Sequence, residues 1–412
     1  MNRKAESIVG RRRAPKPSLT IAIVADLHCH LRSLEYGQES FLLVGSPRIP
    51  PSRHPIQSLV DLVRPVPIRA DLLVCPGDVT NRASPEGLSQ GMEFLLELKR
   101  ELRCSSLLCT LGNHDVNSMG GSDGDHFLIS RTAHPCFPLE EEQKDDYWAH
   151  GFSIIPADKH SLLLMLNTVA DHRDEKTAKR GAFSDDRLYR LDVQLTNVLR
   201  KKSFSFRIAV LHHHPLLHSH ISYLSGDVLG NGDQLIEILA KHKFDLILHG
   251  HKHQPRLRRQ SVGGRNMLVL AAGSFSAFLG DLWSTTRNLF HILTLDKPAT
   301  ADEYVASLRT WEYNHGLGWN PAARRSAGLP HIVKFMGSVP SIPKEDVLRF
   351  LEAEDPQKVN APELFRAFPA LEYLLPDEME SFGGALESEY GFRFVYDEFG
   401  QLYEVGRVVR KS

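Results

Sequence analysis

Short apolar runs alternate with longer amphipathic segments over residues 19–313. Runs such as 19–25, which is apolar throughout, are typical of strands buried on both faces of a largely parallel sheet. The predicted strands cover 19–25, 70–75, 106–109, 152–155, 161–167, 206–211, 244–248, 266–272, 289–296 and 304–313. Helical spacing of apolar residues predicts helices over 56–64, 86–102 and 234–242, and the segment 181–201 begins as a loop and then becomes amphipathic. This alternation predicts an α/β fold.

The pattern changes on either side of this main domain, which we place at residues 19–314. Residues 1–18 are basic and rich in small residues and proline, which predicts a disordered tail. Residues 315–340 begin with a stretch containing Gly, Asn and Arg and are expected to form a linker. The segment 341–412 is acidic, with short helical patterns followed by a β-hairpin over 392–409. We therefore expect a small second unit of unknown role there.

Composition limits the class of protein without identifying it. The 412 residues are 42% hydrophobic and 24% charged, which fits a globular chain, and there is no apolar run long enough for a transmembrane helix. The N-terminus lacks the apolar core of a secretory signal. Five cysteines without paired spacing suggest reduced thiols and a cytoplasmic location. A net charge of −1 disfavours nucleic acid as a partner, although it leaves that class open.

Five polar clusters each follow a predicted strand. They are Asp26-Leu27-His28, Gly77-Asp78, LGNHD at 111–115, the histidines at 212–214, and GHKH at 250–253. A single Asp-x-His after a strand is usually just a turn, and a lone triple histidine is usually a polar loop. All five occur together here, and the carboxyl ends of the strands in such a sheet share one edge. We therefore expect the clusters to meet at one site.

The residue types in these clusters point to metal binding. Carboxylate, amide oxygen and imidazole suit a borderline divalent metal, with Mn or Fe favoured and Zn or Ni also compatible. Asp26 and His28 are two residues apart, and His251 and His253 repeat that spacing. With Asp78, Asn113 and one histidine of the triple, about seven ligands are available, too many for one tetrahedral metal. They fit two metals that share a carboxylate.

The series DLH, GD, GNHD, HHHP and GHKH resembles the calcineurin-like metallophosphoesterase family over about residues 19–300. The resemblance implies a four-layer α/β/β/α sandwich, and the pattern of 341–412 adds a small α+β extension to it. It implies that one metal is held by Asp26, His28 and His253, and the other by Asn113, His251 and one histidine of the triple, with Asp78 as the bridge. Relatives have a histidine pair before proline and use its first member, which corresponds to His213, but the extra His212 leaves this choice open.

The resemblance also implies a mechanism. A metal-bridging hydroxide would attack phosphorus, and His114 would donate a proton to the leaving group. Asp115 would orient the His114 imidazole and favour its charged form. Asn113, His114 and His212 are the candidate substrate contacts.

The motif details separate branches of the family. GDVTNR and GNHD differ from the GDxVDRG and GNHE of the Ser/Thr phosphatases, and His-His-Pro differs from the His-Gln of the nucleases. The pattern is most similar to the cyclic-nucleotide and glycerophosphodiester phosphodiesterases. We therefore expect a small phosphoester or nucleotide substrate and no membrane partner. A phosphomonoesterase, a nucleotide pyrophosphohydrolase, and a non-enzymatic scaffold remain alternatives. The segment 341–412 is the candidate surface for oligomerisation or a protein partner.

Overall fold

The computed structural model describes most of the chain. The described residues are 18–31, 39–66, 68–117, 125–172, 177, 180–217, 228–279, 287–297, 304–353 and 358–408. The predicted disordered tail, except Ser18, lies outside them, and so do His218 and His220, which the sequence places in a loop. Within the described part, no helix has the length and apolar character needed to cross a membrane.

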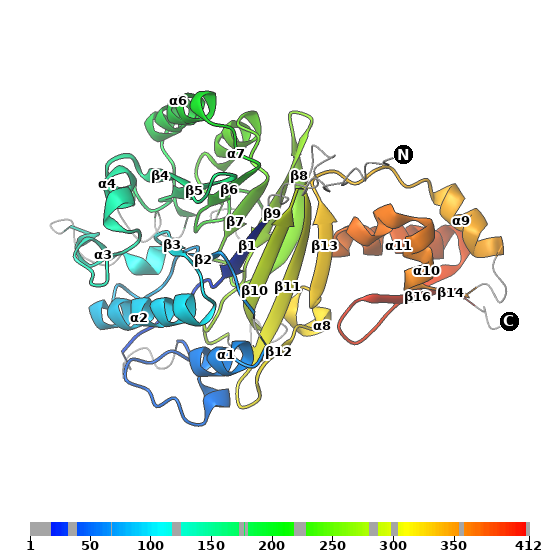
Figure 1. Cartoon of the computed structure of the whole chain (residues 1–412), viewed down its shortest axis with the longest axis horizontal. Helices are drawn as coiled ribbons and strands as arrows, with labels where there is room; N and C mark the ends of the chain where they lie inside the picture. Colours follow the sequence, from blue (N-terminus) through cyan, green and yellow to red (C-terminus); the bar gives the residue numbers. More distant parts are fainter. Residues whose placement is uncertain are drawn as a thin grey trace, which may run out of the picture.

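Two sheets lie face to face at the centre of the molecule (Figure 1). The first has the order β12-β11-β10-β1-β2-β3, with β13 also paired to β11. Its strands are β1 (Ser18–Ile23), β2 (Leu72–Cys75), β3 (Ser106–Cys109), β10 (Asn288–Asp296), β11 (Val305–Asn314), β12 (Gly318–Pro321) and β13 (Ile332–Met336). The second has the order β4-β5-β6-β7-β9-β8. Its strands are β4 (Phe152–Pro156), β5 (Ser161–Leu166), β6 (Phe206–Val210), β7 (Leu246–His249), β8 (Arg256–Val262) and β9 (Arg265–Ala271).

Helices cover the outer faces of both sheets, which completes the predicted α/β/β/α order. Figure 1 shows α1 (Pro55–Val63) and α2 (Pro85–Glu101) on one side, and α6 (Asp185–Lys201) and α7 (Gly232–Lys241) on the other. The shorter helices α3 (Leu128–Arg131) and α4 (Glu141–His150) follow the end of β3.

The buried residues of β6 show why the sequence gives four layers. Phe206, Ile208 and Val210 belong to the large apolar cluster that includes both sheets. Ala209 and the following Leu211 belong to a second cluster with α6 and α7. Because successive side chains of a strand point to opposite faces, both faces of β6 are buried. This explains the uninterrupted apolar run in the sequence, and the strands β1-β2-β3 and β5-β6-β7-β9 are parallel as that run predicts.

Residues 315–340 differ from the expected linker. Strand β12 pairs antiparallel with one end of β11, and β13 pairs with the other end. The short helix α8 (Arg324–Ala327) lies between them in the chain. Gly316 lies in the turn before β12 and Gly328 follows the end of α8, whereas Gly318 and Asn320 belong to β12, so the first sheet continues to Met336.

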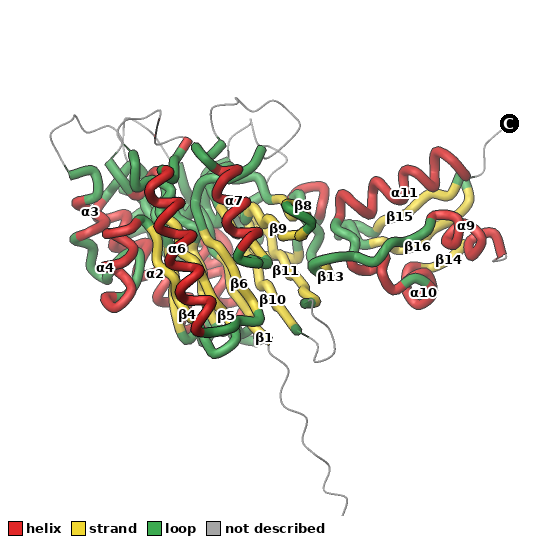
Figure 2. The backbone as a smooth tube through the Cα atoms, turned by 90° about the horizontal axis from the view of Figure 1, so that it is seen from above, coloured by secondary structure: helices red, strands yellow, loops and turns green. Residues whose placement is uncertain are grey.

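The C-terminal module, residues 341–408, has its own core. A three-stranded sheet of order β14-β16-β15 carries the predicted hairpin as β15 (Phe392–Tyr396) and β16 (Leu402–Arg407), with β14 (Lys358–Asn360) added. The helical segments of the module are α9 (Lys344–Ala353), α10 (Ala361–Ala367), η4 (Pro369–Tyr373) and α11 (Pro376–Tyr390). An apolar cluster that contains Val347, Leu386 and Phe392 lies between the sheet and these helices. Figure 2 shows the module beside the main sheets.

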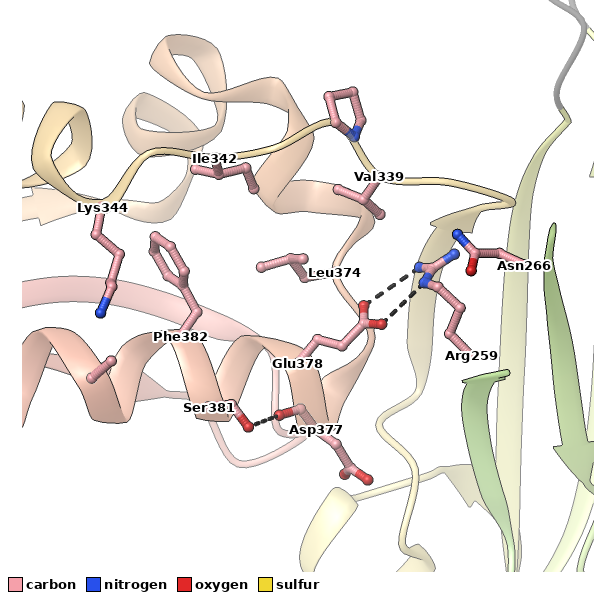
Figure 3. Close-up of a pocket in the computed structure, with 12 residues that line it drawn as sticks. Arg259, Asn266, Val339, Ile342, Lys344, Leu374, Asp377, Glu378, Ser381 and Phe382 are labelled. Atoms are coloured by element: carbon pink, nitrogen blue, oxygen red, sulfur yellow. Dashed lines mark hydrogen bonds and ion pairs between the residues drawn. The ribbon is translucent and has the colours of Figure 1, made fainter. Parts of the chain in front are cut away.

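Arginine–carboxylate contacts join the start of α11 to β8 and α8. Arg259 of β8 contacts Glu378, with 3.0 Å between Arg259 Nε and Glu378 Oε1 (Figure 3). Arg256 and Arg324 both contact Asp377, at 3.1 and 3.3 Å. An open cavity of about 730 Å³ remains between β8 and the module, next to the Arg259–Glu378 pair.

Candidate metal centre

The five predicted clusters meet at the carboxyl ends of β1, β2, β3, β6 and β7, which we call the strand-end rim. Backbone hydrogen bonds join the clusters directly: the Asp26 N–H donates to Gly77 O at 3.2 Å, and the Gly250 N–H donates to His212 O at 3.1 Å. Loops from both sheets therefore contribute to one site, as expected from strand ends that share an edge.

The backbone of these loops is strained where the candidate ligands lie. Ten described residues other than glycine have a positive φ, and half of them are candidate ligands. These are Asp26 (51°), His28 (48°), Asp78 (53°), His251 (78°) and His253 (53°). Left-handed backbone is unfavourable for such residues and concentrates at functional sites, where it aims side chains. The strained backbone supports a functional role for these five side chains, and this support does not depend on their residue types.

Two glycines of the motifs allow the loops to approach closely. A Cβ atom on Gly112 would overlap Asp78 Oδ1, and one on Gly250 would lie 2.6 Å from Asp26 Oδ2. Neither position accommodates a larger residue without moving a candidate ligand. The glycines of GNHD and GHKH are thus explained by packing against the carboxylates.

Asp26, His28 and His253 form a first group of ligand atoms. The Nε2 atoms of His28 and His253 face each other at 2.9 Å, and His253 Nε2 lies 3.9 Å from Asp26 Oδ1. Burial lowers the pKa of His28 well below its usual value and lowers that of His253 to about 4, so both rings are neutral. Ligands 2.0–2.2 Å from one cation lie roughly 3–4 Å from one another, so this group fits a cation.

Asn113, His251 and His212 form a second group. Asn113 Oδ1 lies 3.0 Å from His251 Nδ1 and 3.0 Å from His212 Nε2. The other nitrogen of His212, Nδ1, donates to Pro76 O at 2.9 Å. Because a carbonyl oxygen can only accept a hydrogen bond, Nδ1 carries the proton in the neutral His212 ring. Nε2 then carries a lone pair, and this lone pair faces Asn113.

Within the triple, His212 is the histidine that faces Asn113. His213 lies beside the second group, with its Nδ1 2.8 Å from Thr168 Oγ1 and its ring 4.5 Å from that of His251. His212, by contrast, contacts both the amide oxygen and the carboxylate of the GNHD and GD motifs. His212, His213 and His251 also form a group whose ligand atoms lie within 4.8 Å of one another, so His213 stays a candidate ligand, and the contacts with Asn113 and Asp78 favour His212.

Asp78 lies between the two groups. Its Oδ2 is 3.6 Å from His28 Nε2 and 3.3 Å from His212 Nε2. Burial opposes ionisation of Asp78, but His212 and His114 outweigh it and hold the pKa of Asp78 well below its usual value. Burial likewise disfavours charge on His212, but Asp78 and Asp26 raise its pKa to about 9. The carboxylates of Asp78 and Asp26 thus favour positive charge between the two groups of ligand atoms.

His114 is adjacent to the site and its ring is not directed by Asp115. The ring lies 4.7 Å from that of His28, and burial lowers the pKa of His114. Asp115 was expected to orient this ring. Its carboxylate instead accepts three backbone N–H groups, from Gly112 at 2.8 Å, Asp78 at 2.8 Å and Thr80 at 2.9 Å. These hydrogen bonds correct the expectation, because the Asp115 side chain ties the GNHD loop to the GD loop.

A neighbouring polar cluster was not singled out from the sequence. Arg82 Nη2 donates to Glu39 Oε1 at 2.7 Å, and Asn81 also donates to Glu39. The negative charge of Glu39 raises the pKa of His114, and the positive charge of Arg82 lowers it. Both side chains therefore lie near the His114 ring. Asn81 and Arg82 belong to GDVTNR, but Glu39 comes from a remote loop with no recognisable motif.

The fold and this site define a class of protein, the metal-dependent phosphoesterases. An α/β/β/α sandwich carries groups of Asp and His at its strand-end rim that could hold metal ions. The family model for calcineurin-like phosphoesterases matches residues 19–255. The chain belongs to the calcineurin-like phosphoesterase family.

Individual relatives are distant. A probable cyclic nucleotide phosphodiesterase of Xenorhabdus bovienii is 22% identical over 206 residues, which is 50% of this chain and 66% of that protein. A purple acid phosphatase from yellow lupin seeds is 15% identical with a TM-score of 0.44, covering 72% of this chain and 52% of its own. A putative 5′-nucleotidase of Staphylococcus aureus is 12% identical with a TM-score of 0.39, covering 95% and 70%. The chain thus spans less than two thirds of the first curated relative and about half of the lupin enzyme.

Proposed function

We propose that the chain is a dinuclear metal-dependent phosphodiesterase. The position of Asp78 between two groups of ligand atoms carries this proposal, since Asp78 Oδ2 is within 3.6 Å of a nitrogen in each group. A carboxylate shared between two cations is the arrangement of two-metal hydrolases.

Six further residues complete the proposed centre. Asp26, His28 and His253 would hold one cation, and Asn113, His251 and His212 the other. His212 replaces His213 in this assignment because its Nε2 faces Asn113 and Asp78. Mixed oxygen and imidazole donors favour Mn or Fe, with Zn or Ni also compatible. When bound, two such cations neutralise phosphoryl oxygens and supply an activated water.

His114 is the proposed general acid. Its ring borders His28, and its backbone N–H donates to Asp78 Oδ1 at 2.8 Å, which fixes the residue against the bridging carboxylate. Burial lowers the pKa of His114, but the charge of Glu39 raises it, and a bound phosphodiester anion favours the protonated ring in the same way. The protonated imidazole would give its proton to the leaving alkoxide.

The preference for diesters is supported by the relative from Xenorhabdus bovienii, whose name describes a cyclic nucleotide phosphodiesterase. Cyclic nucleotides are therefore the first natural substrates to consider. The cytoplasmic location, and a homo-oligomer or protein partner bound through residues 341–412, stay predictions.

Hydrolysis of two synthetic substrates tests the proposal. Protein stripped with a chelator is supplied with Mn, Fe, Ni, Zn or Mg and assayed on bis-p-nitrophenyl phosphate and on p-nitrophenyl phosphate. We expect metal-dependent turnover that is faster on the diester. Faster turnover of the monoester would favour a phosphomonoesterase, and no turnover with any metal would contradict the enzymatic proposal.

A further inference from the structure

A polar cavity lies at the end of β6 and β7 that is opposite to the metal centre. It has a volume of about 560 Å³, and its walls include residues that precede β6, β7 and β9. The candidate ligands instead follow β6 and β7. Strands rise about 3.3 Å per residue, so the seven residues from Ser205 to His212 separate the two sites by roughly 20 Å. This cavity is therefore distinct from the proposed active site.

The walls of the cavity are strongly basic. Four of its lining residues carry positive charge and one carries negative charge. The cations are Arg207, Lys243, Arg265 and Lys297, and the acid is Asp245. They come from three segments of the second sheet and, for Lys297, from the end of β10 in the first, so the fold brings these charges together from distant parts of the sequence.

The single carboxylate is already engaged. Asp245 Oδ1 accepts from Arg265 Nη2 at 2.9 Å, and Oδ2 accepts from the Arg207 backbone N–H at 2.9 Å. Neither Lys243 nor Lys297 forms an ion pair with a residue in the described part of the chain. Burial raises the pKa of Asp245 to about 6 while Arg265, Arg207 and Lys297 act against this shift, so three cations share this one carboxylate.

The charge of Arg207 is poorly compensated. Its Nη1 donates to His242 O at 2.6 Å, whereas its buried Nε has no hydrogen-bond partner. Burial and the charge of Arg265 lower the pKa of Arg207, although Asp245 opposes this. An anion in the cavity would relieve this repulsion. Ser203 and Ser205 also line the cavity, and a serine hydroxyl is a neutral donor.

We propose that this cavity binds a small phosphorylated molecule through Lys243, Lys297 and the arginines beside them. The cavity lies within the 300–1,000 Å³ range of small-molecule sites, which is more than a single phosphate ion needs. The site goes beyond the proposed catalytic function and does not depend on it.

Calorimetric titration with methylenediphosphonate, which is resistant to hydrolysis, tests the proposal on the metal-loaded full-length chain. The double variant K243E/K297E reverses the two lysines. We expect it to lose one binding event seen in the unmodified chain, or to weaken it by roughly tenfold or more, because charge-assisted contacts to the phosphonates are replaced by repulsion. A matched control, K159E/K201E, makes the same change in net charge on two exposed lysines outside the cavity walls. The control should bind as the unmodified chain does.

Two results would overturn the proposal. One is unchanged binding by K243E/K297E, and the other is an equal loss in the control, which would indicate a general charge effect. Circular dichroism and melting temperature check that both variants are folded, and K297E alone provides a milder second test. Turnover of bis-p-nitrophenyl phosphate by K243E/K297E is measured separately, so failure of the catalytic proposal does not affect this outcome.

Discussion

At the scale of single residues, the residue types of the candidate ligands were easier to predict than the exact position of each ligand. The sequence identified the types and spacing of all candidate ligands, because strand ends and motif order place them on one edge. It did not distinguish His212 from His213. That choice depends on the hydrogen bond from His212 Nδ1 to Pro76 O, which forms only when β2 and β6 belong to facing sheets.

The first prediction separates the two histidines. His212→Ala should reduce the metal content of the chain to about one ion, because it removes a ligand from the second group only. His213→Ala is the matched control in the next position and should retain about two. Metal content is measured by mass spectrometry after dialysis against chelator-free buffer. Loss of metal in the His213 variant alone would restore the assignment based on Pro215.

The second prediction concerns the leaving group. His114→Ala should slow hydrolysis of alkyl phosphodiesters by roughly 10²–10⁴-fold, because the alkoxide then leaves without a proton. Esters of p-nitrophenol need little protonation and should lose much less. Steady-state rates on both substrate classes give the comparison. Equal losses on the two classes would remove His114 from the role of general acid.

At the scale of elements, the strands that are buried on both faces were predicted closely because that burial leaves a strong pattern, whereas the half-exposed strand β8 and the helix α4 were not predicted. The predicted strand 106–109 coincides with β3, and the helix predicted over 86–102 is α2 within one residue at each end. The loops were less predictable. Asp115 follows a histidine in GNHD and so resembles a partner for it, but the short turn of η2 (Asn113–Asp115) directs its carboxylate onto backbone N–H groups instead.

The third prediction concerns β10 and pH. Burial lowers the pKa of His291 from its usual 6.5 to about 4, while its Nε2 donates to Ala272 O at 2.7 Å. The folded state keeps this ring neutral, whereas the unfolded chain takes up a proton below pH 6.5. The stability that the neutral His291 ring contributes is thus complete above pH 6.5 and is lost as the pH falls toward 4.

Urea unfolding of the unmodified chain and of His291→Gln measures this contribution. Between pH 7 and pH 5, the free energy of unfolding of the unmodified chain should fall by about 2 kcal/mol more than that of the variant. The same fall in both proteins would show that His291 does not titrate as its burial indicates.

At the scale of the whole molecule, the extent of the first sheet was missed. Residues 315–340 contain Gly, Asn and short apolar stretches, which are typical of linkers, and only pairing with both ends of β11 makes them strands. Such long-range pairing has no local signal. The C-terminal module was predicted as a separate unit because its composition changes, but its ion pairs to β8 depend on the tertiary fold.

The fourth prediction concerns how the module is held. Arg259 is mostly buried and contacts Glu378 as well as the carbonyl groups of Met336 and Gly337. Arg259→Ala should therefore increase the rate at which proteinase K cleaves the connection near residues 337–343. Exposed ion pairs contribute little, so Arg393→Ala, which removes a pair within the module, is the control and should not change this rate. Equal rates in all three proteins would show that Arg259 does not restrain the connection.

The central claim is that one carboxylate joins two metal sites, and metal content tests it most directly. The unmodified chain should bind about two divalent ions, and Asp78→Asn should lose both together, since it removes the charge that both groups share. The count is made by mass spectrometry on folded protein, with folding confirmed by circular dichroism. One ion or none in the unmodified chain, or retention of one ion by Asp78→Asn, would contradict the account.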